Sequence, residues 1–414
     1  MRLSALHVNH QLSPNAPRWS AFCSRLCRAR GISFETVTVS VRRGDSLEAR
    51  ARDARYAVFA RRDCNFIALA HHRDDQVETL LLQLLRGAGV KGLAGMPLVR
   101  TEDRGSRIEG KTPARSGRDR NPQSSILNPR ILRPLLDVSR QEILEYAKKR
   151  KLKWIEDESN RDVRFQRNYL RHDVLPVIAR RYPAYRATVA RSVRHLAEAA
   201  GLLEALAVVD AAGQIEDGTL AVAALRRLSP ARARNLLRYF ISARGAALPN
   251  TERLDEALRQ LLHAKQDAQV AIELEGACLR RYEGRVYLAE ARGEPRPFSR
   301  RWRGEKCVEL SGLGGVLTLA RTAGTGISLA RLRSGVVTIR SRRGGERLQP
   351  DCHRPRRSLK NLLQEARMPP WQRERIPLIF CGGKLVWGAT LGIDCAFQAA
   401  AGETAVDPVW SPRG

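Results

Sequence analysis

Apolar and polar positions in the first part of the chain follow two patterns in turn, one typical of strands and one typical of helices. Short apolar runs suited to strands, and stretches with helical spacing between them, follow one another: strands at residues 3–8, 32–41 and 66–70, and helices at 19–30, 46–61 and from about 71 to 85. Strands that alternate with helices predict a parallel sheet covered by helices. The expected fold class of this part is therefore α/β.

The pattern changes at residue 99. From Val99 to Asn128 the sequence is rich in Arg, Gly, Ser, Asp and Pro, which predicts a disordered surface insertion at about residues 100–128. Ser139 and Glu142 have capping-box spacing at the start of a helix that is expected to end at Arg150. Residues 174–262 are rich in Ala, Leu and Arg at helical spacing, which predicts a helical middle domain.

The last third of the chain has a different character. Residues 274–288 resemble a short hairpin, and residues 290–303 are rich in Pro, Gly and charge and form the candidate linker. Beyond the linker, short β-type runs surround one helix near residues 359–365, which predicts a small α+β domain. The expected domains are thus residues 1–172, 173–290 and 304–414.

Charge narrows the class of partner. The 414 residues include 73 Lys and Arg against 43 Asp and Glu, a formal balance of +30, which favours a nucleic-acid partner over an anionic membrane. A high-GC genome that encodes Arg in place of Lys is the alternative, but it does not by itself create a surplus. No apolar run reaches the roughly 18 residues that span a bilayer, and the first residues do not resemble a signal peptide. The 8 scattered cysteines indicate reduced thiols without zinc spacing, so we expect a cytoplasmic protein.

The strongest cluster of chemical groups lies at residues 70–79, where a predicted strand meets a predicted helix. At 100° per residue, His71, Asp75 and Glu78 fall within about 60° of one another on the helix. Ligands of open α/β sheets bind at the carboxyl ends of strands, so this end suits a metal–nucleotide complex or a cationic substrate. The alternative is helix capping by Asp74 and Asp75, which explains one or two of the acids.

Two arginine pairs are ambiguous. Arg52 and Arg55 stand three residues apart and could hold phosphate or carboxylate, but Glu48 and Arg52 also have the spacing of a surface ion pair. Arg167 and Arg171 lie one helical turn apart, an arrangement suited to a phosphate backbone or to a charged helix face.

The C-terminal basic segments at residues 342–347, 355–363 and 368–375 include Trp371 and a Pro pair. They fit contact with a nucleic-acid backbone plus stacking of bases, or else a solvated basic face.

Taken in order, these motifs resemble the tRNA(Ile)-lysidine synthetase family of N-type ATP pyrophosphatases. The matching segments extend over nearly the whole chain: residues 6–10, 48–56, 71–79, 85–89, 133–136, 156–160, 167–171, 360–363 and 369–375. The resemblance implies that ATP with Mg²⁺ adenylates the wobble cytidine of a tRNA(Ile) with a CAU anticodon, and that free L-lysine then displaces AMP. It leaves a homodimer open.

The resemblance also implies roles for individual residues. Asp75 and Glu78 resemble the acidic pair for the lysine amine or Mg²⁺, with Asp75 as the metal ligand, and His71 belongs to the same catalytic signature. The residues expected to bind ATP or lysine are Arg52, Arg55 and Arg86. The residues expected to face tRNA are Arg167, Asn168, Arg171, Lys360, Arg373 and Arg375.

One departure from the family pattern affects activity. The family begins with a strand and a Ser-Gly-Gly-x-Asp-Ser loop that binds the ATP pyrophosphate, whereas the first residues here match the second strand. A mis-assigned start is favoured over a truncated gene, because every later motif is intact. The expectation for the chain as written is an inactive, poorly stable protein. A non-catalytic tRNA-binding remnant is one alternative, and a tRNA 2-thiolation pyrophosphatase is the other, although the latter needs clustered cysteines that are absent.

Overall fold

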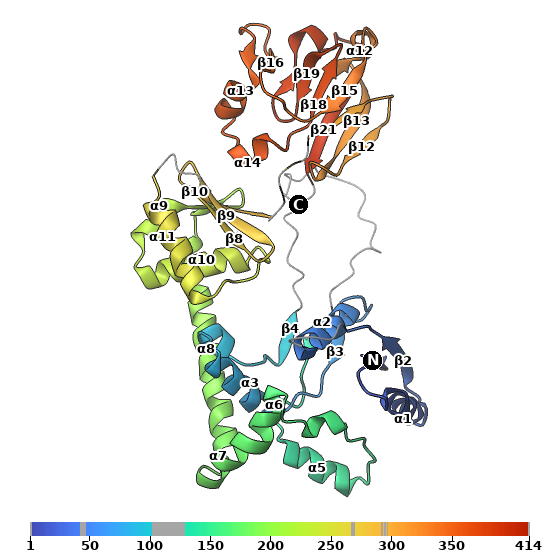
Figure 1. Cartoon of the computed structure of the whole chain (residues 1–414), viewed down its shortest axis with the longest axis vertical. Helices are drawn as coiled ribbons and strands as arrows, with labels where there is room; N and C mark the ends of the chain where they lie inside the picture. The colour runs from blue at the N-terminus through green and yellow to red at the C-terminus, as the bar shows by residue number, and fades with distance from the viewer. Residues whose placement is uncertain are drawn as a thin grey trace. The chain divides into compact units, whose positions relative to one another are not determined.

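The computed structural model describes residues 2–41, 47–101, 129–265, 270–290, 293, 295 and 297–412. These residues form two compact units. Figure 1 labels their elements and colours the chain by residue number. The first unit contains the described residues up to 212 together with residues 230–239. The second contains residues 213–229 and the described residues from 240 onward.

The strands of the first unit pair mainly in parallel, as predicted. Strand β1 (Ser4–Asn9) pairs in parallel with β2 (Ser33–Thr38), and helix α1 (Ala16–Arg28) connects them. After α2 (Leu47–Phe59), strand β3 (Phe66–Ala68) pairs in parallel with β5 (Arg130–Leu132). The described strands form these two sheets separately, whereas a single sheet was expected.

The start of the predicted insertion is a strand. Residues Val99–Thr101 form strand β4, because antiparallel pairing with β5 gives partners to the backbone polar groups of this short segment. The prediction of disorder from residue 99 is wrong for these three residues. Residues 102–128 lie outside the described part of the chain.

Helix α3 (Arg73–Leu85) carries the predicted site and is anchored by its apolar side. Val77 is fully buried and packs with Leu175 and Tyr185. The short helix α4 (Val90–Leu93) follows, and the Gln76 side chain then holds the backbone of Met96 through two hydrogen bonds of 2.7 and 2.8 Å. These contacts fix the orientation of α3.

The segment from α5 to residue 211 contains mainly helices, joined by non-helical stretches such as residues 151–157. Helix α5 (Arg140–Lys149) has the predicted capping box between Ser139 and Glu142. The following elements are η1 (Glu158–Arg161), α6 (Gln166–Tyr169), η2 (Leu170–Val174), α7 (Leu175–Arg181) and α8 (Tyr185–Ala211). The predicted domain limit at residue 172 falls inside η2, and the first compact unit continues to residue 212.

The second unit begins with a mixed segment. It contains β6 (Ile215–Glu216), β7 (Thr219–Ala221), α9 (Val222–Arg227), α10 (Pro230–Ser242, shared between the two units) and α11 (Thr251–His263). The predicted hairpin is present as β9 (Ala277–Tyr282) and β10 (Arg285–Glu290), and β8 (Ala271–Leu274) extends it. All five strands form one sheet in the order β6-β7-β10-β9-β8.

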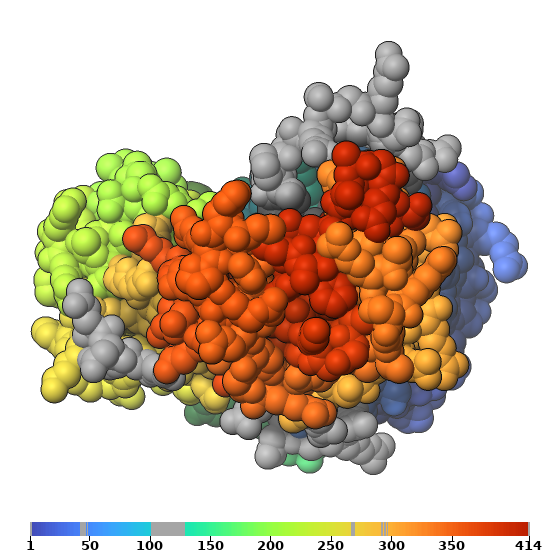
Figure 2. Space-filling model, turned by 90° about the horizontal axis from the view of Figure 1, so that it is seen from above, coloured from blue at the N-terminus to red at the C-terminus, as the bar shows by residue number. Residues whose placement is uncertain are grey.

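The C-terminal part is the predicted α+β domain. Its elements are β11 (Ser299–Arg301), β12 (Cys307–Leu310), β13 (Gly315–Ala323), β14 (Ile327–Ser328), α12 (Leu329–Leu332), β15 (Val337–Arg340), β16 (Arg347–Leu348), β17 (Arg357–Ser358), α13 (Leu359–Glu365), α14 (Pro370–Arg373), β18 (Leu378–Cys381), β19 (Lys384–Gly388), β20 (Gly392–Ile393), η3 (Cys395–Phe397) and β21 (Thr404–Pro412). Two sheets, ordered β11-β15-β18-β19-β20 and β12-β13-β21-β14, enclose an apolar core. The segments around β13 and β21 lie side by side on the face in Figure 2.

The linker prediction is partly wrong. Residues 299–301 belong to the folded domain as β11, because they pair antiparallel with β15. Among the described helices, none has the length and apolar character that crossing a bilayer requires.

Candidate functional site

The N-terminus of α3 is capped by its own side chains. The His72 backbone N–H donates to the Asp75 carboxylate at 2.9 Å, and the Asp75 N–H donates to His72 Nδ1 at 3.4 Å. This reciprocal pair is a capping box. The capping alternative thus accounts for part of the Asp75 environment, but it does not account for Glu78.

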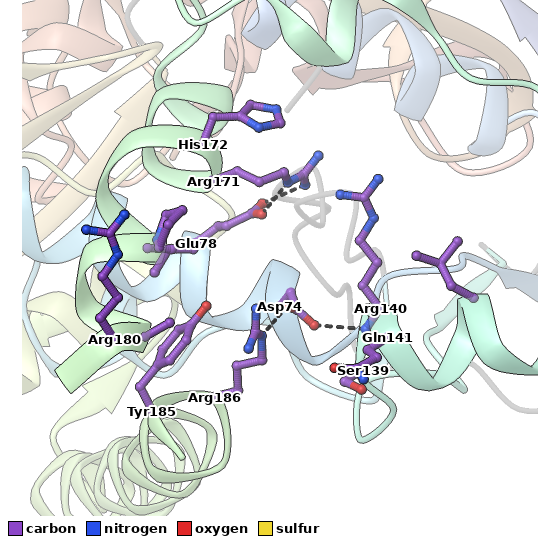
Figure 3. A pocket seen from close by; sticks show the side chains of 14 residues that line it. Asp74, Glu78, Ser139, Arg140, Gln141, Arg171, His172, Arg180, Tyr185 and Arg186 are labelled. Atoms are coloured by element: carbon purple, nitrogen blue, oxygen red, sulfur yellow. Dashed lines mark hydrogen bonds and ion pairs between the residues drawn. The ribbon is translucent and has the colours of Figure 1, made fainter. Parts of the chain in front are cut away.

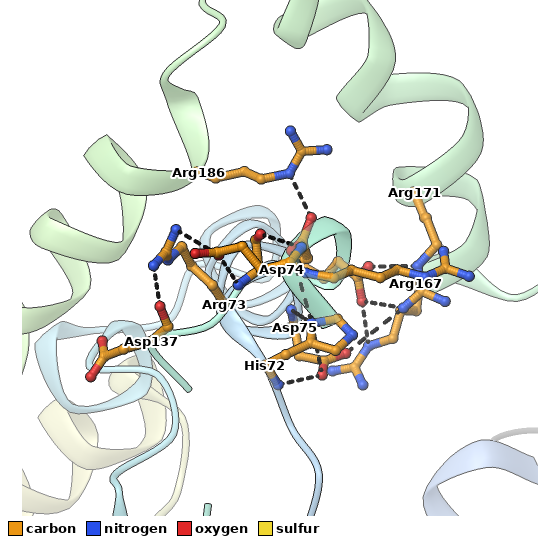
Figure 4. Close-up of polar contacts among 12 residues, drawn as sticks. His72, Arg73, Asp74, Asp75, Asp137, Arg167, Arg171 and Arg186 are labelled. Carbon is orange, nitrogen blue, oxygen red and sulfur yellow. Dashed lines mark hydrogen bonds and ion pairs between the residues drawn. The ribbon is translucent and has the colours of Figure 1, made fainter. Parts of the chain in front are cut away.

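Glu78 is clamped by two arginines that are distant in sequence. Its carboxylate is fully buried and accepts two hydrogen bonds from the Arg171 guanidinium, at 2.7 and 3.0 Å. Arg167 lies 3.4 Å from the same carboxylate, and Arg171 also lies 3.8 Å from Asp75 (Figure 4). Such a bidentate arrangement is among the strongest polar contacts in proteins. Burial raises the pKa of Glu78 above its ordinary value, and the hydrogen bond from Arg171 opposes that rise.

Asp74 is a site residue that sequence reasoning did not select. Its carboxylate accepts hydrogen bonds from Arg186 of α8 at 2.5 Å and from the Arg140 backbone N–H at 2.9 Å. Burial would raise the pKa of Asp74, but the hydrogen bonds from Arg140 and Arg186 outweigh it and hold this pKa below its ordinary value. The Asp-Asp pair marked this position, but its partner is 112 residues away and has no local signal.

A cavity of about 670 Å³ opens beside these pairs. The polar residues around it include two carboxylates and several cations: Asp74, Glu78, Arg140, Arg171, His172, Arg180 and Arg186 (Figure 3). Its apolar lining comes from Leu144, Leu175, Pro176 and Ala179. Glu78 and Asp74 therefore border a space large enough for a small ligand, whereas Asp75 and His71 are not among its lining residues.

His71 is held neutral beside several arginines. Burial lowers its pKa to about 4, opposed by Asp75 and reinforced by the charges of Arg133 and Arg167. Its Nδ1 is buried and has no hydrogen-bond partner among the described residues, and the same is true of His7 Nε2. Buried polar atoms without a partner are uncommon, and unpartnered atoms beside arginines fit an anionic ligand.

The buried Arg133 is a second residue that the sequence analysis missed. Its side chain is 1% exposed and donates to the Pro97 carbonyl at 2.8 Å. A charged residue inside the apolar run at 131–136 was the signal that could have identified it.

The three arginines predicted for ATP or lysine are not brought together. Arg52 stacks on the Tyr56 ring at 5.2 Å, and Arg55 is close enough to His10 and His71 to lower the pKa of both. Arg86 follows the last residue of α3 and donates to the Gln166 side chain at 2.7 Å. Only Arg55 therefore belongs to the group around His71.

The predicted tRNA-facing residues near 167–171 point toward the site. Arg167 donates to Thr79 Oγ1 at 3.1 Å in addition to its contact with Glu78. Asn168 is buried and donates to the carbonyls of Ser159 and Asp162 at 2.7 and 2.9 Å. Asn168 thereby ties the η1 segment to α6, which carries Arg167 and continues directly into η2 with Arg171.

The C-terminal candidates differ in exposure. Lys360 is exposed on α13. Arg373 donates to the Met368 carbonyl at 2.7 Å and to the Tyr282 hydroxyl at 3.1 Å, and Arg375 bonds the Gly293 carbonyl. Trp371 packs edge-on against Tyr282 and Tyr287, with ring centroids 6.1 and 5.4 Å apart, so this ring already has aromatic partners within the second unit.

Among the residues that the structure describes, no group of three or more His, Cys, Asp or Glu side chains could hold a metal ion. The predicted Mg²⁺ therefore lacks a protein ligand set of its own in this part of the chain. The Asp75 carboxylate is engaged by His72 and Arg171.

Comparisons with known proteins cover all parts of the chain. Residues 1–178 match the PP-loop domain, residues 220–287 the TilS substrate binding domain, and residues 337–410 the TilS substrate C-terminal domain. A tRNA(Ile)-lysidine synthase from Nitrosomonas europaea is 45% identical over 415 aligned positions, which cover 100% of this chain and 86% of the relative. The enzymes of the same name from Coxiella burnetii and Azoarcus sp. are each 39% identical, over 93% and 99% of this chain and 81% and 85% of the respective relative.

Proposed function

The chain belongs to the tRNA(Ile)-lysidine synthase family, and from this premise we propose that it ligates lysine to C2 of the wobble cytidine of a tRNA(Ile) with a CAU anticodon. The observation that carries the proposal is the 45% identity over 100% of the chain. In the first step the C2 oxygen bonds the α-phosphorus of ATP and diphosphate leaves. In the second step the lysine ε-ammonium releases a proton, its nitrogen bonds C2, and AMP leaves with the oxygen.

The carboxylates at α3 are paired with arginines, and this pairing supports a site in which one substrate changes the charge available to the next. Three carboxylates, those of Asp74, Asp75 and Glu78, are in contact with three arginines, Arg167, Arg171 and Arg186. A lysine ammonium gains little from acids whose charges are already neutralised. When Arg167 or Arg171 turns to a phosphate, Glu78 and Asp75 become available to the amine. Phosphate binding would thus prepare the acidic pocket for the second substrate.

The surroundings of His71 support a phosphate subsite. Arg55, Arg133 and Arg167 all act on the His71 pKa, and the imidazole stays neutral near pH 7 because its pKa is about 4. A neutral imidazole with an unpartnered Nδ1 can donate to a phosphate oxygen without adding charge. Mg²⁺ would be held mainly by the phosphate oxygens of ATP, with Asp75 as its protein ligand. Arg52 and Arg86 stay predicted ligands of ATP or lysine.

For tRNA we revise the predicted assignments near the site. Arg167 and Arg171 act on the acids of α3, and Asn168 positions them. Lys360, Arg373 and Arg375 keep their predicted role because they lie in the part of the chain that matches the C-terminal domain of the family. The homodimer stays a prediction.

Transfer of labelled lysine to a tRNA(Ile) transcript tests the function. We expect label in the transcript with C34 and none in a matched transcript with U34, with lysidine identified by mass spectrometry of the nucleosides. The assay is run on the chain as printed and on the chain extended by the reading frame upstream of Met1. Absence of lysidine in both versions, while the Nitrosomonas europaea enzyme is active alongside, contradicts the proposal.

The acids themselves can be tested by Asp75→Asn and Glu78→Gln. Each change removes a carboxylate that would hold the ammonium or, for Asp75, Mg²⁺ in the first step, so we expect lysine transfer to fall on the order of 100-fold, as for other preorganised polar groups. The affinity for tRNA should stay within about two-fold, because neither change removes a cation. Glu145→Gln, an exposed acid of α5, is the matched control. Full lysine transfer by the Glu78→Gln variant would remove Glu78 from the site.

A tRNA 2-thiolation enzyme is the second candidate and is not favoured. The described cysteines of the first unit are Cys23, Cys27 and Cys64, none of them among the cavity-lining residues. The relatives that match the whole chain are named as lysidine synthases.

A further inference from the structure

A groove on the first unit, separate from the α3 site, is lined by cations and aromatic rings. Its volume is about 470 Å³, and it lies between α1 and the extended segment after α5. The residues that matter here are Arg18, Phe22, Arg25, Lys153, Trp154 and Ile155, and we call it the Trp154 groove. None of the described residues that line it is acidic.

The cations of this groove are unpaired within the described part of the chain. The side chains of Arg18, Arg25 and Lys153 make no hydrogen bond or ion pair with the residues that the structure describes. The arginines of the α3 site, by contrast, are committed to carboxylates. Three cations without a counter-ion in one groove attract a polyanion.

The aromatic lining adds a surface on which a base can stack. Trp154 is 48% exposed, although large aromatic side chains are usually buried, and Phe22 lies half-buried beside it in the same groove. Arg18, Phe22 and Arg25 recur at helical spacing on one face of α1. The backbone rises about 10 Å along the helix axis from Arg18 to Arg25, and the Phe22 position lies between them. Cations that flank exposed rings are the pattern of single-stranded nucleic-acid sites.

The two walls of the groove are fixed to each other. Asn15 at the start of α1 donates to both oxygens of Glu158 at 2.9 Å, and Ser13 donates to the same carboxylate at 3.1 Å. Glu158 follows the groove segment by three residues, so these bonds hold α1 against it. A groove that is already formed loses less entropy when a ligand binds.

We propose that the Trp154 groove binds an unpaired nucleotide of the tRNA substrate, with the base stacked on Trp154 and the flanking phosphates held by Arg18, Arg25 and Lys153. The identity of the RNA rests on the proposed function, whereas the recognition of nucleotide by ring and cation rests on the groove alone. The nucleotide bound in the groove is not the reacting cytidine. Its contacts contribute to substrate affinity and take no part in the chemical steps.

Four variants of the full chain test the proposal through tRNA affinity measured over a range of salt. Trp154→Ala should weaken binding at least about five-fold, the lower end of the range for base–aromatic stacking, whereas Trp154→Phe keeps a ring and most of the affinity. The pair Arg18→Ala and Arg25→Ala should lower the slope of log affinity against log salt by about 1.4, for two lost contacts to a single strand. The pair Arg28→Ala and Arg30→Ala removes the same charge from residues that do not line the groove, and should leave the slope nearly unchanged.

A lysine-transfer assay distinguishes failure of the groove proposal from failure of the proposed function. At saturating tRNA the groove variants should turn over as the unaltered chain does, with a higher tRNA concentration at half-maximal rate. If the unaltered chain transfers no lysine but the groove variants still lose tRNA affinity, the groove stands and the ligase assignment fails. Equal effects of the two arginine pairs, or unchanged affinity in Trp154→Ala, overturn the groove proposal.

A fluorescence titration distinguishes RNA from free nucleotide. The chain has 6 tryptophans, so the Trp154 signal is taken as the difference between the unaltered chain and Trp154→Phe. We expect a short oligoribonucleotide to quench this signal. A response to ATP with none to RNA would overturn the proposal.

Discussion

Replacing Arg171 with Met tests whether the arginine clamp stabilises the fold. The change leaves the fully buried Glu78 carboxylate without its bidentate partner. Removing one member of a buried ion pair costs about 3–5 kcal/mol. Arg167 remains 3.4 Å from Glu78, and the Arg171 side chain is 20% exposed, so we expect a loss at the lower end, about 3 kcal/mol.

The pH dependence of that loss has a defined sign. A carboxyl group whose pKa is higher in the folded state binds its proton more tightly when folded, so the protein gains stability as pH falls through that pKa. Burial already raises the pKa of Glu78, and removal of Arg171 raises it further. The loss caused by Arg171→Met should therefore be complete at about pH 8 and smaller at about pH 5.

Urea titration read by hydrogen exchange of peptides from α3 and α8 measures the first unit by itself. The control is the double variant Glu78→Gln with Arg171→Met, which has no unpaired carboxylate and should recover more than half of the lost stability. A loss below about 0.5 kcal/mol, or an equal loss at both pH values, would refute the argument that Glu78 needs Arg171.

Three further predictions concern groups around the site. Gly95→Ala should destabilise the first unit by about 2 kcal/mol or more in urea titration, because φ is +64° and an added Cβ would lie 2.6 Å from the Gln76 side chain. Gly87→Ala is the control: its φ is +70° and no atom lies within 4 Å, so it should lose only the backbone contribution of about 1–2 kcal/mol. Equal losses in the two variants would contradict the steric argument. His71 should titrate near pH 4 by NMR, and a titration near pH 6.5 would refute its burial. Because its pKa is lower in the folded state, the protein loses stability as pH falls from about 6.5 toward 4, and His71→Gln should flatten the plot of stability against pH over this interval. Asn168→Ala should lower the free energy of unfolding by about 1–3 kcal/mol and reduce lysine transfer, because two backbone carbonyls lose their donor. Asn160→Ala, an exposed position of η1, should change neither quantity, and unchanged lysine transfer by Asn168→Ala would exclude the positioning role.

Local patterns predicted much of the architecture. The alternation of periods between residues 3 and 85 identified β1, β2, β3 and the helices between them, since each element has to bury one apolar face. The capping box at Ser139 and the helix at 359–365 were also predicted, because both depend on neighbours within one turn. The errors include β4 and β11, short strands that depend on pairing with β5 and β15. The expected single sheet of the first part of the chain was also wrong, because the described strands pair as two sheets.

For the site, residue types and helical spacing predicted that His71, Asp75 and Glu78 gather where a strand meets a helix, and the charge surplus indicated a polyanionic partner. Helix α3 carries Asp75 and Glu78, whereas His71 precedes the N-cap residue His72 and so lies outside the helix. Only the tertiary structure decided how those acids are used. Arg171 reaches Glu78 across 93 residues and Arg186 reaches Asp74 across 112, and such pairs leave no periodic trace in the sequence. The physical reason is that backbone propensity and side-chain period act over a few residues. Neutralisation of a buried carboxylate depends instead on which distant cation the fold brings within about 4 Å.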